Sequence, residues 1–328
     1  MKTIISTISI YLALSFCIAS YAKTSVNVHN NIATTKVAAT NDFDTTSFIT
    51  VWETTTANES ITIPTNSSVV YDYTVDWGDG TIDTNVTGDA THTFATPGTH
   101  TIKINGDFPR IFFNNSGDRL KIKEVTQWGT IQWGLMASAF RGCENLDVTA
   151  TDTPDLSNTN NMTSMFFGCS SLVGNASFNA WDVSNVRFMF ATFSRSSFNQ
   201  PINNWNVSNV TNMQRMFSLT NFNQPLNNWN VSNVENMLGM FQDNTAFDQN
   251  LGSWDISSVT DMTDMFLNGT LSIENYDNML LGWATLDTGE TQIPTNINFN
   301  GGNSQYCNAN LSRIDLINNY SWSISDGG

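Results

Sequence analysis

The stretch "FNQPINNWNVSNVTNMQRMF" at residues 198–217 is followed almost at once by "FNQPLNNWNVSNVENMLGMF" at residues 222–241. Aligned on its first large residue, the same unit begins at Trp128, Pro154, Trp181, Trp205, Trp229 and Trp254. These starting residues are separated by 26, 27, 24, 24 and 25 positions. Self-similarity at such a period is typical of architectures in which each repeat stacks on its neighbours. The repetition therefore predicts the fold of the central part of the chain.

Apolar residues follow two periods within one unit, as the unit that contains Trp229 illustrates. Trp229 and Val231 are two positions apart, which is the spacing of one face of a strand. Val234, Met237 and Met240 are three positions apart, as in a helical turn. Each unit is therefore predicted to contain one short strand and one tight return. Burial of its few apolar side chains cannot offset the entropy of ordering its backbone, so we expect the units to share one core.

Polar residues alternate with the tryptophan and the valine of each unit. If the apolar side chains point inward, the polar ones lie on an exposed strand face, which is a candidate surface for an extended ligand. A solvated polar face that binds nothing is the alternative interpretation. The predicted ligand-binding residues are Asp182, Ser184, Asn204, Asn206, Ser208, Asn228, Asn230, Ser232, Asp255 and Ser257.

The first residues carry the pattern of an export signal. Lys2 is followed by an apolar run over residues 11–18 and by small residues up to Ala22, which predicts a signal peptide over residues 1–22. Residues 23–42 lack apolar periodicity and are predicted to be a flexible leader. A lipoprotein signal at Cys17 is a second interpretation, which Phe16 disfavours. We expect a bacterial protein that is secreted or held at the cell surface, without a membrane span.

Composition excludes some partners. Charged residues make up 13% of the chain, and the formal net charge is −16. From Glu124 onward there are 18 acidic residues against 5 arginines and no lysine. Such a surface repels nucleic acid and anionic lipid. Beyond the signal the chain has three cysteines, Cys143, Cys169 and Cys307, so no disulfide framework is expected. Cys143 and Cys169 are predicted to stack as buried thiols, with a disulfide between them as the alternative.

Residues 43–117 predict a β-sandwich. Short alternating runs such as "SFITVWET" are bounded by Pro, Gly and Asn. The motifs "VDWGDGT" and "THTFATPGTHTIKI" make this segment resemble the polycystic-kidney-disease (PKD) type of immunoglobulin-like domain. The resemblance implies a spacer or a site of weak surface contacts. Asp72, Asp76, Asp79 and Asp83 offer oxygen ligands for calcium, but Asp76 and Asp79 also suit the shaping of a turn.

A second resemblance covers the repeats. The segments "SAFRGCENL" at residues 138–146 and "SMFFGCSSL" at residues 164–172, together with the later Asn-rich units, resemble the BspA-like leucine-rich-repeat surface proteins and the bacterial lipoprotein-type repeats of unknown function. Residues 271–328 look like the terminal cap of that group. The expected fold class is mainly β with short helical turns: an immunoglobulin-like β-sandwich followed by a leucine-rich-repeat-like solenoid over residues 118–270. The resemblance implies binding to host proteins or to other cells.

The repeats lack the usual catalytic groups. His29, His92 and His100 all precede them, so no Ser–His pair forms there, and no Cys/His cluster has metal-ligand spacing. Asp182 and Asp255 could serve as paired carboxylates, but they occupy equivalent repeat positions. We predict a binding or adhesion protein for protein ligands, without enzymatic activity, cofactor or metal. The alternatives are a carbohydrate-binding protein and a β-helix enzyme that degrades acidic polysaccharide. Such an enzyme needs basic residues in its groove, and the central units offer only Arg187, Arg195 and Arg215. The oligomeric state stays open.

Overall fold

The computed structural model describes residues 43–328, which form one compact unit. The predicted signal peptide and flexible leader lie outside the described residues. The elements of the first part are α1 (Phe43–Thr46), β1 (Phe48–Thr54), β2 (Glu59–Ile63), β3 (Asp72–Asp76), β4 (Ile82–Val86), β5 (Ala90–Phe94) and β6 (Gly98–Asp107). Those that follow are β7 (Ile122–Gln127), β8 (Asp147–Val148), the 3-10 helix Ala176–Ala180, α2 (Ile273–Trp283), β9 (Asn298–Asn300), α3 (Asn310–Tyr320) and β10 (Ser323–Ser325).

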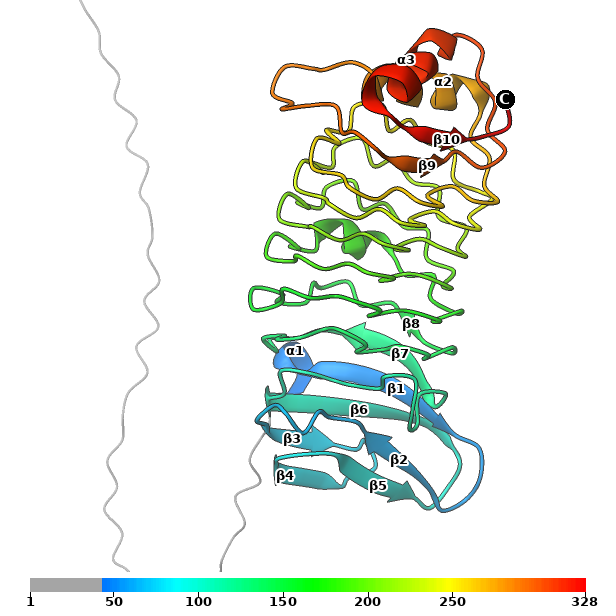
Figure 1. Ribbon diagram of the computed structural model, residues 1–328. Coiled ribbons are helices and arrows are strands. Elements are labelled where there is room, and N and C mark those ends of the chain that lie inside the picture. Colours follow the sequence, from blue (N-terminus) through cyan, green and yellow to red (C-terminus); the bar gives the residue numbers. More distant parts are fainter. Residues whose placement is uncertain (1–42) are drawn as a thin grey trace, which may run out of the picture. The chain divides into compact units, whose positions relative to one another are not determined.

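An open six-stranded sheet has the order β4-β3-β6-β1-β7-β8 (Figure 1). Its first five strands are antiparallel to their neighbours, and β8 joins β7 in parallel. Strands β2 and β5 form a separate antiparallel pair. Alternation decides which side chains are buried: Phe48 and Trp52 of β1 lie in the core, at most 1% exposed. This sheet therefore extends from the N-terminal strands directly into the first repeats.

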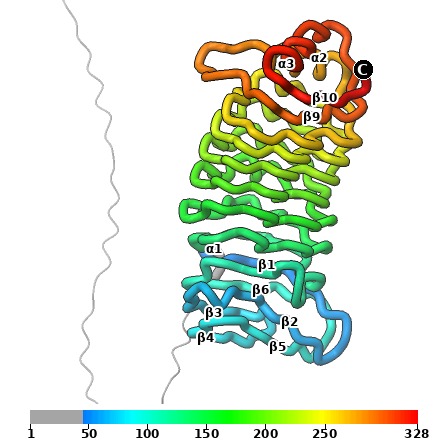
Figure 2. Tube along the Cα trace, in the orientation of Figure 1, coloured from blue at the N-terminus to red at the C-terminus, as the bar shows by residue number. Residues whose placement is uncertain are grey.

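The repeats stack as layers that begin after β7 and end at β9 (Figures 1 and 2). A layer is named here by its first large residue, from the Trp128 layer to the Trp254 layer. Alternate N–H groups donate to the next layer, as Met213 does to the Asn236 carbonyl and Arg215 does to the Leu238 carbonyl, both at 2.9 Å. The N–H groups between them bond within the layer instead, as Met216 does to Met213 at 3.1 Å. Only isolated parallel bridges result, such as Asn212 with Asn236.

The expected fold class is therefore corrected. The larger sheet is neither closed nor confined to an immunoglobulin-like sandwich, because β7 pairs with β1 and β8 pairs with β7. The layers that follow are not a leucine-rich-repeat-like solenoid of strands, since N–H groups that would continue a ladder, such as those of Met216 and Ser218, close local turns. The Trp-x-Val segments are not strands either. The predicted mainly-β character agrees with the structure, which is mostly β with few helices. The predicted domain boundaries stay predictions.

The predicted inward orientation of tryptophan and valine is confirmed. Trp205 is 2% exposed and Val207 is 1% exposed. Neighbouring indoles stack, with ring centroids 6.4 Å apart between Trp205 and Trp229 and 6.5 Å apart between Trp229 and Trp254. The Trp229 indole also donates to the Ile202 carbonyl of the preceding layer at 3.0 Å. The indoles of Trp205, Trp229 and Trp254 therefore fill the shared core, and each ties two layers together by its hydrogen bond.

Two departures from the repeat change the packing. Pro154 replaces a tryptophan, and Trp128 meets Trp181 edge to face at 5.4 Å. The indole N–H groups of both have no hydrogen-bond partner among the described residues. Thr192 replaces a methionine, and its buried hydroxyl donates to the Met162 and Met189 carbonyls at 3.1 and 2.9 Å. The hydroxyl is therefore satisfied inside the core.

The last layers are closed by α2, α3 and the parallel pair β9–β10 (Figure 1). The Phe266 N–H donates to the Asn300 carbonyl at 3.0 Å, so β9 takes the place of a further layer. Trp283 of α2 continues the tryptophan row, since its indole donates to the Leu251 carbonyl at 3.1 Å. Between residues 43 and 328, no helix is both long and apolar enough to cross a bilayer.

Candidate functional site

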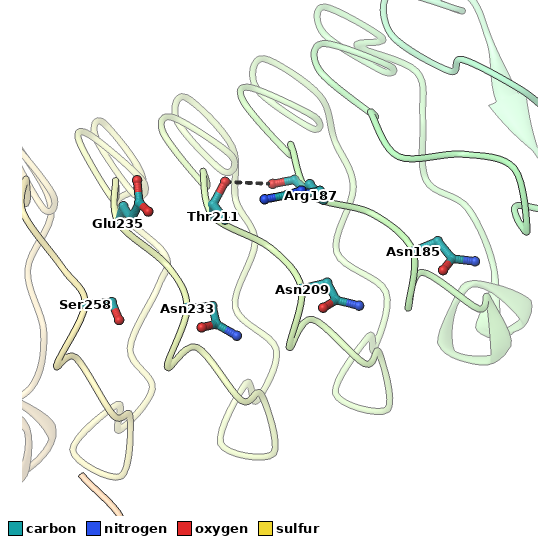
Figure 3. A pocket seen from close by; sticks show the side chains of 7 residues that line it. All are labelled: Asn185, Arg187, Asn209, Thr211, Asn233, Glu235 and Ser258. Atoms are coloured by element: carbon teal, nitrogen blue, oxygen red, sulfur yellow. Dashed lines mark hydrogen bonds between the residues drawn. The ribbon is translucent and has the colours of Figure 1, made fainter. Parts of the chain in front are cut away.

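A groove of about 560 Å³ crosses four consecutive layers, and we call it the lateral groove (Figure 3). Its lining residues form two rows, with one member of each row contributed by successive layers. The amide row consists of Asn185, Asn209 and Asn233, and Ser258 continues it. The second row consists of Arg187, Thr211 and Glu235. All seven are polar.

Buried valines position the two rows. Val210 lies between Asn209 and Thr211 and is 0% exposed, so its two neighbours point away from the core. The Asn209 Nδ2 donates to the Ser184 carbonyl of the preceding layer at 2.7 Å. Asn185 and Asn233 make the equivalent bonds, at 3.0 and 2.7 Å. Since only the amide nitrogen can donate to a carbonyl, each Oδ1 is left as a free acceptor.

The second row holds two opposite charges at fixed places. The Thr211 N–H donates to the Arg187 carbonyl and the Glu235 N–H donates to the Thr211 carbonyl, both at 2.9 Å. The side chains of Arg187 and Glu235 are exposed and make no hydrogen bond or ion pair with any other described residue. Two layer spacings separate them, or roughly 10 Å at the usual distance between paired strands. The groove thus offers neutral acceptors flanked by a free cation and a free anion.

The ten residues predicted from the sequence lie beside this groove, in turns. Asn206 accepts the Ser208 N–H at 3.2 Å, and Asn230 accepts the Ser232 N–H at 3.1 Å. Asp182 accepts the Ser184 N–H at 3.0 Å, and the hydrogen bonds from Ser184 hold the pKa of Asp182 below its usual value. These side chains therefore shape turns. Asp182, Asn204, Asn206, Asn228 and Asn230 are exposed, whereas Ser184, Ser208, Ser232 and Asp255 are half-buried.

Ser257 departs from the other predicted residues, because it is buried. Its N–H donates to Asp255 at 2.9 Å, and its hydroxyl accepts the Thr291 N–H at 3.2 Å. The sequence analysis predicted Ser208 and Ser232, but the residues that line the groove are their immediate successors, Asn209 and Asn233. Asn209 follows Ser208 directly, and its recurrence as Asn185 and Asn233 was the signal that could have identified the amide row.

Of the other reactive side chains, the thiols of Cys143 and Cys169 are buried, whereas the thiol of Cys307 is exposed. Cys143 and Cys169 are buried free thiols, and desolvation raises the pKa of both. The Cys169 thiol donates to the Phe140 carbonyl at 3.1 Å. Asp182 and Asp255 belong to layers three repeats apart, roughly 14 Å, which exceeds the separation that paired glycosidase carboxylates use.

The proposed calcium ligands have bonds of their own in the glycine turn. Asp76 accepts the Gly78 N–H, Asp79 accepts the Thr81 N–H, and Asp83 accepts the Trp77 indole N–H, each at 2.9 Å. In the part of the chain that the structure describes, no three His, Cys, Asp or Glu side chains are grouped to hold a metal ion. The arrangement fits the turn-shaping interpretation.

Comparison with known proteins gives one family. Residues 134–221 and 218–288 are similar to the family described as "Mycoplasma protein of unknown function, DUF285". The two matched segments contain the whole lateral groove. No curated protein and no solved structure gave a significant match.

Proposed function

We propose that the chain is a secreted or cell-surface binding protein that recognises an extended segment of a protein ligand in the lateral groove. The observation that carries this proposal is the row of free amide oxygens, one per layer, beside the unpaired charges of Arg187 and Glu235. Unpaired exposed charges and free acceptors on a rigid frame are available to a partner without any rearrangement. The resemblance to BspA-like surface proteins supports the same class of function.

The spacing of the groove suits a polypeptide. Free amide oxygens accept main-chain N–H groups, which an extended peptide presents along its length. Side chains on the same face of an extended peptide are two or four positions apart, or roughly 7 or 13 Å at ~3.3 Å per residue, which brackets the roughly 10 Å between Arg187 and Glu235. The preferred ligand therefore carries an acidic and a basic residue two or four positions apart.

The tryptophan side chains of these layers do not favour a carbohydrate ligand. The stacked indoles of Trp205, Trp229 and Trp254 are at most 3% exposed, so they offer no ring face to a sugar. A glycan ligand is therefore an outcome of the test rather than part of the proposal.

The test is selection from a random peptide library, with a glycan array in parallel. The mature chain should enrich peptides with opposite charges two or four positions apart, and the variant Arg187→Glu with Glu235→Arg should enrich the reversed order. The matched control is Asn204→Ala with Asn228→Ala, which removes two exposed side chains of the neighbouring turns and should leave the selection unchanged. Binding of glycans alone, lost in Asn209→Ala, would overturn the proposal.

A further inference from the structure

A second hollow lies where the N-terminal sheet meets the first layers, and we call it the junction hollow. Its volume is about 540 Å³, close to the 560 Å³ of the lateral groove. Its lining combines apolar and polar side chains, whereas the lining of the lateral groove is entirely polar. Among its lining residues are Val70, Asp107, Pro109, Gln132, Gly134 and Asn158.

The junction hollow continues the two rows of the lateral groove toward the N-terminus. In the Trp181 layer of the groove, Asn185 and Arg187 flank the buried Val186. The two preceding layers repeat this arrangement, with Asn158 and Asn160 around Thr159 and with Gln132 and Gly134 around Trp133, and both central residues are 0% exposed. The neighbours of a buried residue in extended backbone point away from the core. The side chains of Gln132 and Asn158 therefore extend the amide row.

Hydrogen bonds hold the nearer end of the junction hollow beside the groove. The Asn185 Nδ2 donates to the carbonyl of Ser157, the residue before Asn158, at 3.0 Å. The Arg187 N–H donates to the Asn160 carbonyl at 2.9 Å. Both rows of the groove are thus in direct contact with the Pro154 layer.

Two further hydrogen bonds lead to the far end of the hollow. The Thr159 hydroxyl donates to the Trp133 carbonyl at 2.8 Å, and the Gly134 N–H donates to the Pro109 carbonyl at 2.9 Å. The junction hollow and the lateral groove therefore lie on one face of the stack. Three spacings between neighbouring segments separate Pro109 from Arg187, or roughly 14 Å.

Asp107 brings an unpaired carboxylate to the junction hollow. It is exposed at the end of β6 and makes no hydrogen bond or ion pair within residues 43–328. Asp72 of β3 lies directly opposite it in the strand pairing, and the Asp72 carboxylate has no partner among these residues either. Like charges directly opposite each other in antiparallel strands are destabilising. A cation bound at Asp107 would remove this repulsion.

The rest of the lining suits the stem and the head of an arginine side chain. Val70 is 87% exposed and forms an apolar wall together with Pro109. The methylene stem of arginine packs on such a surface while its charged head reaches polar groups. The Gln132 amide bonds to Asp155, so its N–H group is the donor and its oxygen stays free. A planar guanidinium, with five N–H donors, can bond to a carboxylate and to an amide oxygen at once.

We propose that the junction hollow binds an arginine side chain of the same protein ligand whose acidic residue binds Arg187. The inference rests on the proposed function, because it adds one anchor to that ligand. Along the face the charged side chains follow in the order Asp107, Arg187 and Glu235, so the ligand carries a basic, an acidic and a basic residue in turn. Four positions of extended peptide span roughly 13 Å and return to the same face, which matches the roughly 14 Å between the first two anchors.

The test uses two labelled nine-residue peptides with a central Glu and with Arg and Lys four positions to either side, one peptide for each order. A matching pair carries citrulline, which keeps the stem of arginine without its charge. In one of the two orders, the mature chain should bind the citrulline peptide about fivefold more weakly, because an exposed ion pair is lost. Asp107→Asn should bind both versions of that peptide equally. Fluorescence anisotropy measures the affinities.

Two further variants act as controls. Glu274→Gln removes one exposed charge from α2 in the cap and should keep the fivefold difference. Val70→Ser should weaken the arginine and citrulline peptides alike, since both keep the aliphatic stem. Melting temperatures of all variants establish that they are folded.

Three results would overturn the proposal. They are equal binding of arginine and citrulline peptides by the wild type, a fivefold difference that persists in Asp107→Asn, and displacement of the peptide by an equal concentration of spermidine. The last would replace the arginine of a protein with a free polyamine. The proposed function is judged separately, by Arg187→Glu. Peptides that bind the wild type and lose affinity in that variant would uphold the lateral groove even where Asp107→Asn has no effect.

Discussion

At the scale of single residues, two positions in each complete layer have a left-handed backbone whatever side chain they carry. The first column is Ser138, Ser164, Ala191, Arg215, Gly239 and Asp264, and the second is Gly142, Gly168, Arg195, Leu219, Asp243 and Asn268. The non-glycine members have φ values between 53° and 63°. These bends direct alternate N–H groups to the next layer and the others into local turns. The strain recurs through the stack, and glycine relieves it only in some layers.

Leu219 gives the sharpest test of this strain. Leu219→Asn should raise the free energy of unfolding by about 1 kcal/mol, because asparagine tolerates the left-handed region and the leucine is 40% exposed. Urea unfolding measures the change. The matched control is Leu135→Asn, at a leucine that is 41% exposed and has no left-handed backbone. A gain of equal size at both positions would show that strain is not the cause.

The tryptophan row offers a second matched pair. Trp229 and Trp181 are both buried, but only the Trp229 indole has a hydrogen-bond acceptor. Trp229→Phe should therefore destabilise the chain by about 1–2 kcal/mol more than Trp181→Phe does, because the latter removes a buried N–H that bonds to nothing. Thermal and urea unfolding of the two variants measure the difference. Equal losses would mean that packing alone sets the cost.

At the scale of elements, α3 depends on a side chain of α2 for its first turn. The N-cap residue Ala309 provides no side-chain hydrogen bond. Asp277 of α2 accepts the N–H groups of Cys307, Asn308 and Ala309 at 2.9, 2.9 and 3.0 Å. Burial by itself raises the pKa of the Asp277 carboxyl, but the three bonds outweigh it and lower that pKa. An anion at a helix N-terminus is also favoured by the helix dipole.

A pH dependence follows from Asp277. Because its pKa is lower in the folded chain than in the unfolded chain, its contribution is complete at neutral pH and is lost as the pH falls through the folded pKa. Asp277→Asn should cost about 2 kcal/mol near pH 7 and much less below about pH 3. Melting temperature against pH, with hydrogen exchange of residues 307–320, measures both. A cost that does not change with pH would contradict the capping role.

The local patterns in the sequence were sufficient to predict which side chains are buried, but not to predict which segments form strands. The Trp-x-Val spacing correctly placed Trp205 and Val207 in the core. It did not reveal where the N–H groups bond, because alternation specifies faces rather than hydrogen-bond partners. The groove was missed for a related reason. Arg187 and Glu235 occupy equivalent positions with opposite charges, so they become a site only once the layers are in register.

At the scale of the whole molecule, the continuous sheet explains why the N-terminal strands do not form the immunoglobulin-like sandwich that the sequence predicted. Strand β7 pairs with β1, although β2 to β6 lie between them in the sequence. Strand β8 then pairs with β7 and belongs to the first layer. Pairing between segments so distant in sequence leaves no local signal. The β-strands of residues 48–127 thus provide a surface on which the first layer can stack, and β9 closes the other end.

Removal of one complete layer tests the stacking and the groove together. Deletion of residues 205–228 joins Asn204 to Trp229 and keeps the repeat in register. The shortened chain should fold, with a smaller free energy of unfolding and a smaller m-value, because a layer contributes its own core and one interface. Deletion of residues 205–216 is the control, since it should prevent folding by breaking the register. Failure of the full-layer deletion to fold would contradict independent stacking.

The same deletion makes a prediction for ligand binding. Without Thr211, Arg187 and Glu235 lie in adjacent layers, roughly 5 Å apart, and can pair with each other. The groove should then lose its preference for peptides with opposite charges two or four positions apart, even though the protein remains folded. Library selection with the shortened chain measures this loss. An unchanged preference would mean that ligand recognition does not depend on the two-layer separation of these charges, and the groove would have to be discarded as the recognition site.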